Sequence, residues 1–210
     1  EGTSKEDKKN QITVNVNEIV MDLDTTGAET VYVTNFKELK DAVLTTKTKR
    51  NIVLGADITM ESLITVPAGT VVKIRDDGHT RTLSRNEKHT ALFFETWYGT
   101  GLVLEGTSEG KLVLDGKTSG EAILKNVNSL VRVRGTSEFT NVAFQNNGNA
   151  EVAISGAFVR NEYGYATVSN CSFTKGTAKY GAAIYSCGDK LTVTDSMFAN
   201  NNATEHGGAI

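Results

Sequence analysis

Residues 198–210 read Phe-Ala-Asn-Asn-Asn-Ala-Thr-Glu-His-Gly-Gly-Ala-Ile, and two elements of this stretch recur upstream. One element is an alanine followed by an aliphatic residue, with copies at Ala91-Leu92, Ala122-Ile123, Ala153-Ile154, Ala183-Ile184 and Ala209-Ile210, spaced by 31, 31, 30 and 26 residues. The other is an apolar residue followed closely by polar turn residues, at Leu114, Phe144, Phe173 and Phe198. Self-similarity at a period of about 30 residues is typical of repeat architectures.

A third set of aliphatic residues fits the same period and lies in short β-branched runs, at Leu104, Val133, Val168 and Val193. Each period therefore holds three short strands in a fixed order. Because one coil of three strands cannot bury its apolar side alone, neighbouring coils must stack. The pattern predicts an all-β fold, a right-handed parallel β-helix with three sheets and about five coils. The longest turn insertion is expected at residues 156–164.

One helix is predicted before the coils. Asn35 lies at a cap position with Glu38 three residues later, a capping-box pattern. The apolar residues that follow fall on one helical face: Phe36, Leu39, Ala42 and Val43. Such an amphipathic helix would cover the first coil and hide an unpaired sheet edge.

The domain organisation follows from these elements. We expect a flexible leader at residues 1–11 and a single β-helix domain over 12–210. Within this domain, the cap occupies about residues 12–50 and the coils residues 51–210. The array is expected to be truncated at its C-terminal end, since a terminal repeat needs a polar cap.

Composition excludes several classes of partner. The net charge is −3 and no basic run exceeds Lys8-Lys9, so no footprint for nucleic acid is visible. No apolar stretch reaches ~18 residues, so no membrane insertion is expected. Two cysteines, Cys171 and Cys187, form no disulfide framework, and both are expected to be small buried hydrophobes, with their pairing left open.

Strand alternation and the turn residues assign directions to individual side chains. In residues 130–135, Val131 and Val133 are predicted to point inward, and Arg132 and Arg134 outward. Three polar residues precede the phenylalanine column by the same interval and predict a structural turn ladder: Asn141, Asn170 and Asp195. The same register makes Cys171 an inward, unreactive thiol.

The repeats resemble those of a known family. Phe198-Ala199-Asn200-Asn201 and Phe144-Gln145-Asn146-Asn147 look like the Phe-x-x-Asn repeats of chlamydial polymorphic membrane proteins and related adhesin-like β-helices. Phe173-Thr174-Lys175-Gly176 departs from them, with Gly in place of Asn. Residues 36–116 resemble the entry region of pectate-lyase-like surface proteins. The resemblance implies an extracellular location, at the bacterial surface or secreted, and often adhesion.

This fold also hosts polysaccharide lyases and hydrolases, so a catalytic function is an alternative to binding. Asp76-Asp77-Gly78-His79 is the strongest acidic candidate, but it also reads as an ordinary turn. The three histidines are scattered without metal-ligand spacing. We therefore assign no catalytic residue, no metal site and no cofactor.

Binding is the other class of function. The only tryptophan, Trp97, lies beside Tyr98 in a predicted turn, where it either contacts a ligand or packs over the coil edge or the capping helix. Tyr163 and Tyr165, near Arg160, form a second candidate surface in the expected insertion.

Three hypotheses remain. The leading one is a monomeric adhesin-type module that binds a host protein or glycan through turn insertions. The second is a polysaccharide lyase or hydrolase whose active site lies mostly in coils beyond residue 210. The third is a rigid stalk that displays a distal domain.

Overall fold

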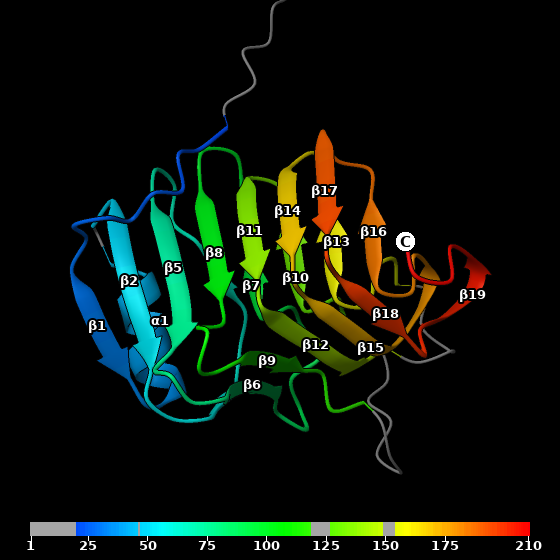
Figure 1. Cartoon of the computed structure of the whole chain (residues 1–210), viewed down its shortest axis with the longest axis horizontal. Helices are drawn as coiled ribbons and strands as arrows, with labels where there is room; N and C mark the ends of the chain where they lie inside the picture. Colours follow the sequence, from blue (N-terminus) through cyan, green and yellow to red (C-terminus); the bar gives the residue numbers. More distant parts are fainter. Residues whose placement is uncertain (1–19, 46, 119–126, 149–153) are drawn as a thin grey trace, which may run out of the picture.

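A computed structural model describes residues 20–45, 47–118, 127–148 and 154–210. Within these residues the chain winds into a right-handed parallel β-helix of about five coils (Figure 1). Each coil contributes one strand to each of three sheets, which confirms the predicted fold class. The expected leader at residues 1–11 lies outside the described residues.

The strands of each sheet pair in parallel along the axis of the β-helix. Sheet A contains β1 (Thr30–Val33), β2 (Lys49–Leu54), β5 (Val71–Asp76), β8 (Gly101–Glu105), β11 (Thr136–Thr140), β14 (Tyr165–Ser169) and β17 (Lys190–Thr194). Sheet B contains β3 (Ile58–Met60), β6 (Arg81–Arg85), β9 (Leu112–Asp115), β12 (Val142–Asn147), β15 (Ser172–Tyr180) and β18 (Met197–Ala199), with β19 (Asn202–His206) beside β15. Sheet C contains β4 (Ile64–Thr65), β7 (Phe94–Glu95), β10 (Val131–Val133), β13 (Val159–Asn161) and β16 (Ile184–Ser186).

Helix α1 (Phe36–Val43) begins at the predicted cap. The side chain of Asn35 accepts a hydrogen bond from the Glu38 backbone N–H at 3.0 Å, and the Glu38 carboxylate accepts one from the Thr34 N–H at 2.7 Å. The buried side chains of the helix are the four predicted ones. The helix packs against β1, β2 and β3 at the N-terminal end of the coils (Figure 1), as the capping role requires.

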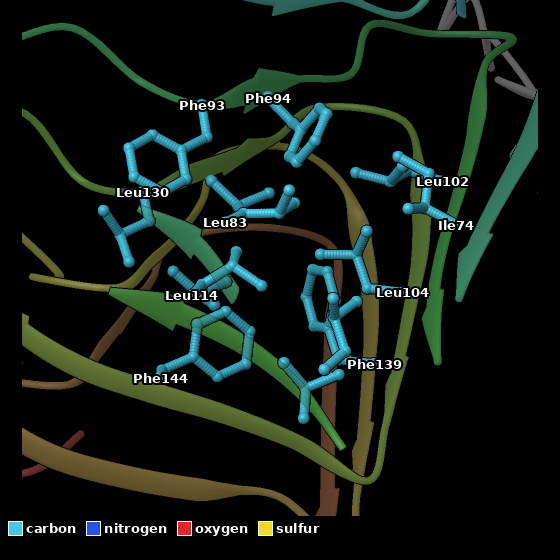
Figure 2. Close-up of a cluster of buried hydrophobic side chains, with 14 of the residues drawn as sticks. Ile74, Leu83, Phe93, Phe94, Leu102, Leu104, Leu114, Leu130, Phe139 and Phe144 are labelled. Carbon is cyan, nitrogen blue, oxygen red and sulfur yellow. The ribbon is translucent and has the colours of Figure 1, made fainter. Parts of the chain in front are cut away.

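The core is one continuous apolar column inside the three sheets. Leu114, Phe144, Phe173 and Phe198 stand in register across four strands of sheet B, as predicted. Figure 2 shows side chains of all three sheets meeting there, with Leu83 of sheet B, Phe94 of sheet C and Leu104 of sheet A among them. Val131 and Val133 are buried while Arg132 and Arg134 are partly exposed, which confirms their predicted directions.

The predicted turn ladder is present between sheets A and B. Asn141, Asn170 and Asp195 have φ angles of 54°, 51° and 49°, in the left-handed region that Asn and Asp tolerate. The two cysteines are free. Cys171 is buried as predicted, whereas Cys187 is exposed and the expectation that it is buried is wrong. Burial raises the pKa of the Cys171 thiol to about 11, which makes it unreactive.

Two of the predicted columns are partly wrong. Val133 lies in sheet C, and Phe139 takes its predicted place between Leu104 and Val168 in sheet A. In sheet C, the neighbour of Ile184 is Val159 rather than Ile154.

The alanine–aliphatic column is also wrong at Leu92. The sheet C register that runs from Ile184 through Val159 and Val131 reaches Phe94 and not Leu92. The last two members do stack, because the N–H groups of Ala183 and Ile184 donate to the Ala209 carbonyl at 2.8 and 3.0 Å. Ala122, Ile123 and Ala153 lie outside the described residues.

Unequal spacing between the strands along the sequence explains these errors. Residues 116–130 separate β9 from β10, and residues 148–158 separate β12 from β13, so a uniform period misplaces the strands that follow. The expected insertion at residues 156–164 is also wrong, because it contains β13 itself.

Candidate functional site

Trp97 and Tyr98 lie in the turn between β7 and β8, where the sequence placed them, and both side chains are partly exposed. Trp97 is 44% exposed and Tyr98 62%. The Trp97 backbone N–H donates to Thr100 Oγ1 at 2.9 Å, and this hydroxyl donates to the Trp97 carbonyl at 2.7 Å. The turn is therefore closed by hydrogen bonds between its own residues.

The other three predicted residues are distributed over different surfaces. Arg160 lies in the middle of β13, on the outer face of sheet C, rather than in an insertion. Tyr163 is exposed in the next turn and has a φ of 59°. Tyr165 is the first residue of β14 and lies half-buried in sheet A. Arg160 and Tyr165 therefore lie in different sheets.

Arg160 is part of a charged network on the outer face of sheet C. We call it the arginine cluster, and its members are Glu95, Arg132, Arg134, Arg160 and Glu162. Glu95, Arg132 and Arg160 form one row because their positions pair across β7, β10 and β13. Arg134 and Glu162 come two residues later along the chain, so strand alternation returns them to the same side.

The two carboxylates of the cluster bridge the three guanidinium groups. Arg132 Nη1 lies 3.1 Å from Glu95 Oε1, and Arg134 Nη1 lies 3.6 Å from the same oxygen. Glu162 holds Arg134 through Oε2, at 2.8 Å from Nη2, and Arg160 through Oε1, at 2.5 Å from Nη2. Arg132 Nε completes the network at 3.8 Å from Glu162 Oε2. Such shared pairs fix the guanidinium planes in defined orientations.

The acidic groups lie beneath the basic ones. The side chains of Glu95 and Glu162 are 9% exposed, whereas those of Arg132 and Arg134 are 22% exposed and that of Arg160 is 32% exposed. Burial acts to raise the pKa of Glu162, but the Arg134 hydrogen bond and the charges of the three arginines outweigh it and lower the pKa. Three guanidinium groups and two carboxylates give the cluster a formal charge of +1, and the basic groups are its more exposed members.

Aromatic side chains flank the cluster at both ends. The Trp97 ring lies 4.4 Å from Arg134 Cζ, a cation–π contact. At the other end, Tyr185 of β16 pairs in register with Arg160. The pKa of Tyr185 is raised by the charge that Cys187 can carry and by a hydrogen bond between the two side chains. Trp97 and Arg160, predicted as separate candidates, are therefore joined through Arg134 and Glu162.

Sequence reasoning missed Glu95, Glu162 and Tyr185. The outward direction of Arg132 and Arg134 was predicted, but not their carboxylate partners. Glu95 precedes Arg132 by 37 residues and Glu162 follows Arg134 by 28. Only the strand register brings them together, and the alternation Val131-Arg132-Val133-Arg134 was the one available signal.

The acidic turn at residues 76–79 is structural, as the alternative interpretation predicted. Asp76 is fully buried and accepts hydrogen bonds from the backbone N–H groups of Thr107 and Gly78, at 2.7 and 2.8 Å. Asp77 pairs with Arg81 at 2.6 Å. The side chain of Asp76 therefore joins its own turn to the turn at Thr107 in the next coil.

No group of three or more His, Cys, Asp or Glu side chains within the described ranges is arranged to hold a metal ion. In the same part of the chain, none of the helical structure has the length and apolar character needed to cross a membrane.

Comparison of the sequence with models of protein families, with curated proteins and with solved structures gave no significant match. The strand pairing itself defines the fold.

Proposed function

We propose that the chain is the ligand-binding β-helix of an adhesin-type bacterial protein, secreted or displayed at the cell surface. In this proposal the outer face of sheet C holds an acidic group of a host glycan or host protein. The observation that carries it is the arginine cluster, whose guanidinium groups lie outside its carboxylates and beside the exposed Trp97 ring. Guanidinium groups present planar pairs of donors that match carboxylate and sulfate oxygens.

The cluster is preorganised for such a ligand. Arginine side chains lose considerable rotamer freedom when they are fixed by a ligand. Here Glu95 and Glu162 already hold the three guanidinium groups, so part of that entropy cost is met before the ligand arrives. The resemblance of the repeats to chlamydial polymorphic membrane proteins and pectate-lyase-like surface proteins supports the proposed location and adhesive role.

Binding is favoured over glycoside hydrolysis at this face. A hydrolase needs a carboxylic acid that stays protonated until it protonates the leaving group. Glu162 has a lowered pKa and is held in ion pairs, and Glu95 lies 3.1 Å from the Arg132 guanidinium. These contacts suit carboxylates that orient arginines rather than carboxylates that transfer protons.

Trp97 provides a direct test because it is the only tryptophan and contacts Arg134. Titration with acidic oligosaccharides and acidic peptides should change its fluorescence. Arg160→Gln should raise the Kd at least about tenfold, the scale of one charge-assisted hydrogen bond. Raising the salt concentration to about 0.5 M should weaken binding, since surface charges are screened.

The matched control is Arg75→Gln, which removes an outward arginine from β5 of sheet A. The control should bind like the unaltered protein. An Arg160→Gln variant with unaltered affinity, or unchanged Trp97 fluorescence with every acidic ligand, would contradict the proposal.

A further inference from the structure

The chain passes from sheet C to sheet A through short turns, and two of these turns carry exposed aromatic side chains. Trp97 and Tyr98 lie between β7 and β8, and Tyr163 lies between β13 and β14. Their exposed fractions are 44%, 62% and 58%. We call these three residues the aromatic edge. Described turns of the same kind continue on both sides of it, at residues 66–70 and 187–189, so the edge lies within the array.

The turn that separates the two aromatic turns is the shortest of the three. It consists of Arg134 and Gly135, between β10 and β11. The Arg134 N–H donates to the Thr96 carbonyl at 3.2 Å, and the Gly135 carbonyl accepts a hydrogen bond from the Tyr165 N–H at 2.9 Å. A Cβ atom on Gly135 would overlap the carbonyl oxygen of Trp97. Because glycine has no side chain, Arg134 is the one side chain that this turn places between the aromatic turns.

Tyr163 has a backbone conformation that disfavours an aromatic residue. Its φ angle is 59°, in the left-handed region where bulky L residues are strained. Tyr163 lies two residues before the next strand of sheet A, and in two earlier turns this position holds glycine, at Gly69 and Gly99, with φ angles of 72° and 71°. Among the described residues with positive φ, Tyr163 is the one aromatic. Strained positions of this kind cluster at active sites and ligand clamps.

Arg134 connects the aromatic edge to the arginine cluster. The Trp97 ring covers one face of its guanidinium, at 4.4 Å from Cζ. Glu162 accepts hydrogen bonds from Arg134 Nε and Nη2 at 3.1 and 2.8 Å. Nη1 lies 3.6 Å from Glu95 Oε1, which is longer than a hydrogen bond, so this nitrogen keeps its donor capacity. The guanidinium is therefore held in place by the protein and still has N–H groups for an anion.

The surroundings favour a glycan over an extended peptide. A peptide that adds a strand to a sheet needs a free strand edge. At this site β10 pairs with β7 on one side and with β13 on the other, so its backbone offers no such edge. Recognition must therefore use side chains, which here are tyrosine rings and guanidinium groups. A pyranose ring has faces of C–H groups that pack against aromatic rings, and uronic acids or sulfated sugars supply the anion that an arginine binds.

We propose that the ligand of the arginine cluster is an acidic oligosaccharide whose carboxylate or sulfate pairs with the cluster at Arg134 while neighbouring sugar rings pack on Tyr98 and Tyr163. This inference rests on the proposed function and selects a glycan over an acidic peptide. Neighbouring strands lie about 4.8 Å apart, so turns that are two coils apart are separated by roughly 10 Å. A ligand that contacts both tyrosines must therefore contain more than one sugar ring.

The probes are a tetrasaccharide of alternating glucuronic acid and N-acetylglucosamine, a heparin-derived tetrasaccharide and a tetraglutamate peptide. Trp97 contacts Arg134, so its fluorescence reports the binding of each probe. The tetrasaccharides should bind more tightly than the peptide, which carries carboxylates but no rings. The relative affinities of the two tetrasaccharides distinguish carboxylate from sulfate as the anionic group.

Tyr163→Gly separates binding from folding. Because glycine adopts the left-handed conformation without strain, the midpoint of urea denaturation should stay close to that of the unaltered protein. Tyr163→Gly and Tyr98→Ala should each weaken tetrasaccharide binding about three- to tenfold, the scale of one ring contact, and leave the affinity for tetraglutamate unchanged. Tyr32→Ala, which removes an exposed tyrosine from β1 of sheet A, is the matched control and should bind normally.

The outcomes distinguish the two proposals. If the tetrasaccharides bind both tyrosine variants as tightly as the Tyr32→Ala control, the aromatic edge is not part of the site and the proposed function stands. If tetraglutamate binds more tightly than both tetrasaccharides, the choice of a glycan is overturned. If no probe changes Trp97 fluorescence, both proposals fail.

Discussion

The ring of Phe144 lies parallel to the ring of Phe173, with 4.8 Å between their centroids and 2° between their planes. Phe198 continues the stack at 4.9 Å and 5°. These separations are close to the spacing of neighbouring strands in a sheet, about 4.8 Å. The stack therefore follows from placing the same residue type at one register position of β12, β15 and β18.

Phe173→Ala should destabilise the protein by about 3–5 kcal/mol, because it removes the fully buried middle ring of the stack. Urea denaturation followed by circular dichroism measures the loss. Tyr32→Ala is the control and should cost less than about 0.5 kcal/mol, since Tyr32 is an exposed surface residue. A loss below about 1 kcal/mol for Phe173→Ala would contradict the core position of this ring.

The predictable part of the fold is the part governed by local chemistry. The phenylalanine column, the turn ladder and the cap of α1 follow from strand alternation, left-handed turns and a capping box, which each involve residues close in sequence. The register of sheet C does not follow, because it depends on how many residues separate its strands from the preceding ones. Residues 116–130 separate β9 from β10, and this long spacing places Val133 in sheet C, whereas a uniform period predicts it in sheet A.

The site shows the same division. Trp97 was identified from its turn and Arg160 from its neighbours, but their connection through Arg134 and Glu162 is a product of coil stacking. An outward arginine in one strand does not reveal which carboxylate lies in the next coil. Tyr165 was grouped with Tyr163 by proximity in sequence, although it belongs to sheet A.

Arg85 is a structural residue that no sequence signal identified. Its guanidinium is buried and donates to four oxygen atoms, at distances between 2.6 and 3.1 Å: the carbonyls of His89, Ala91 and Asn128 and the side chain of Asn147. The Phe93 ring lies 5.2 Å from its Cζ. Burial lowers the pKa of Arg85 to about 10.

Arg85→Met should lower the free energy of unfolding by about 3 kcal/mol or more, because several buried acceptors lose their donor at once. The control is Arg81→Met in the same strand, which breaks a partly exposed pair with Asp77 and should cost about 1 kcal/mol or less. Urea denaturation measures both losses. Equal losses in the two variants would show that the buried hydrogen bonds of Arg85 stabilise the protein no more than the partly exposed Arg81 pair does.

His89 should make stability depend on pH. Burial lowers the pKa of His89, as does the charge of Arg85, while a hydrogen bond with the Leu92 carbonyl acts to raise it. Between the lowered folded pKa and the ordinary value of 6.5, the unfolded chain binds the proton and the folded protein does not. The free energy of unfolding should therefore fall as the pH decreases below 6.5.

His89→Asn tests this prediction because it keeps a polar side chain that does not titrate. Denaturation curves between about pH 7.5 and pH 5 should show a smaller pH dependence for the variant than for the unaltered protein. If the two slopes agree, His89 is not the titrating group.

Glu162 should contribute to stability because it neutralises Arg134 and Arg160 and lies close to Arg132. Glu162→Gln leaves these partly buried guanidinium groups with only Glu95 between them, and removal of one partner from a buried ion pair costs about 3–5 kcal/mol. Because the arginines are still partly exposed to water, the loss of unfolding free energy should lie near the lower end of this range. Glu105→Gln, which breaks a pair with Lys73 on sheet A, is the control and should cost about 1 kcal/mol or less.

The pH dependence of stability provides an independent measurement of the ion pairs that Glu162 forms. The folded pKa of Glu162 is lowered, so its contribution is fully present above its ordinary value of 4.5 and is lost as the pH falls through the lowered pKa. The stability difference between the unaltered protein and Glu162→Gln should therefore shrink below pH 4.5. A difference that stays constant through this range would mean that Glu162 acts by packing alone. In that case the carboxylate would not be what holds the guanidinium groups in place for a ligand.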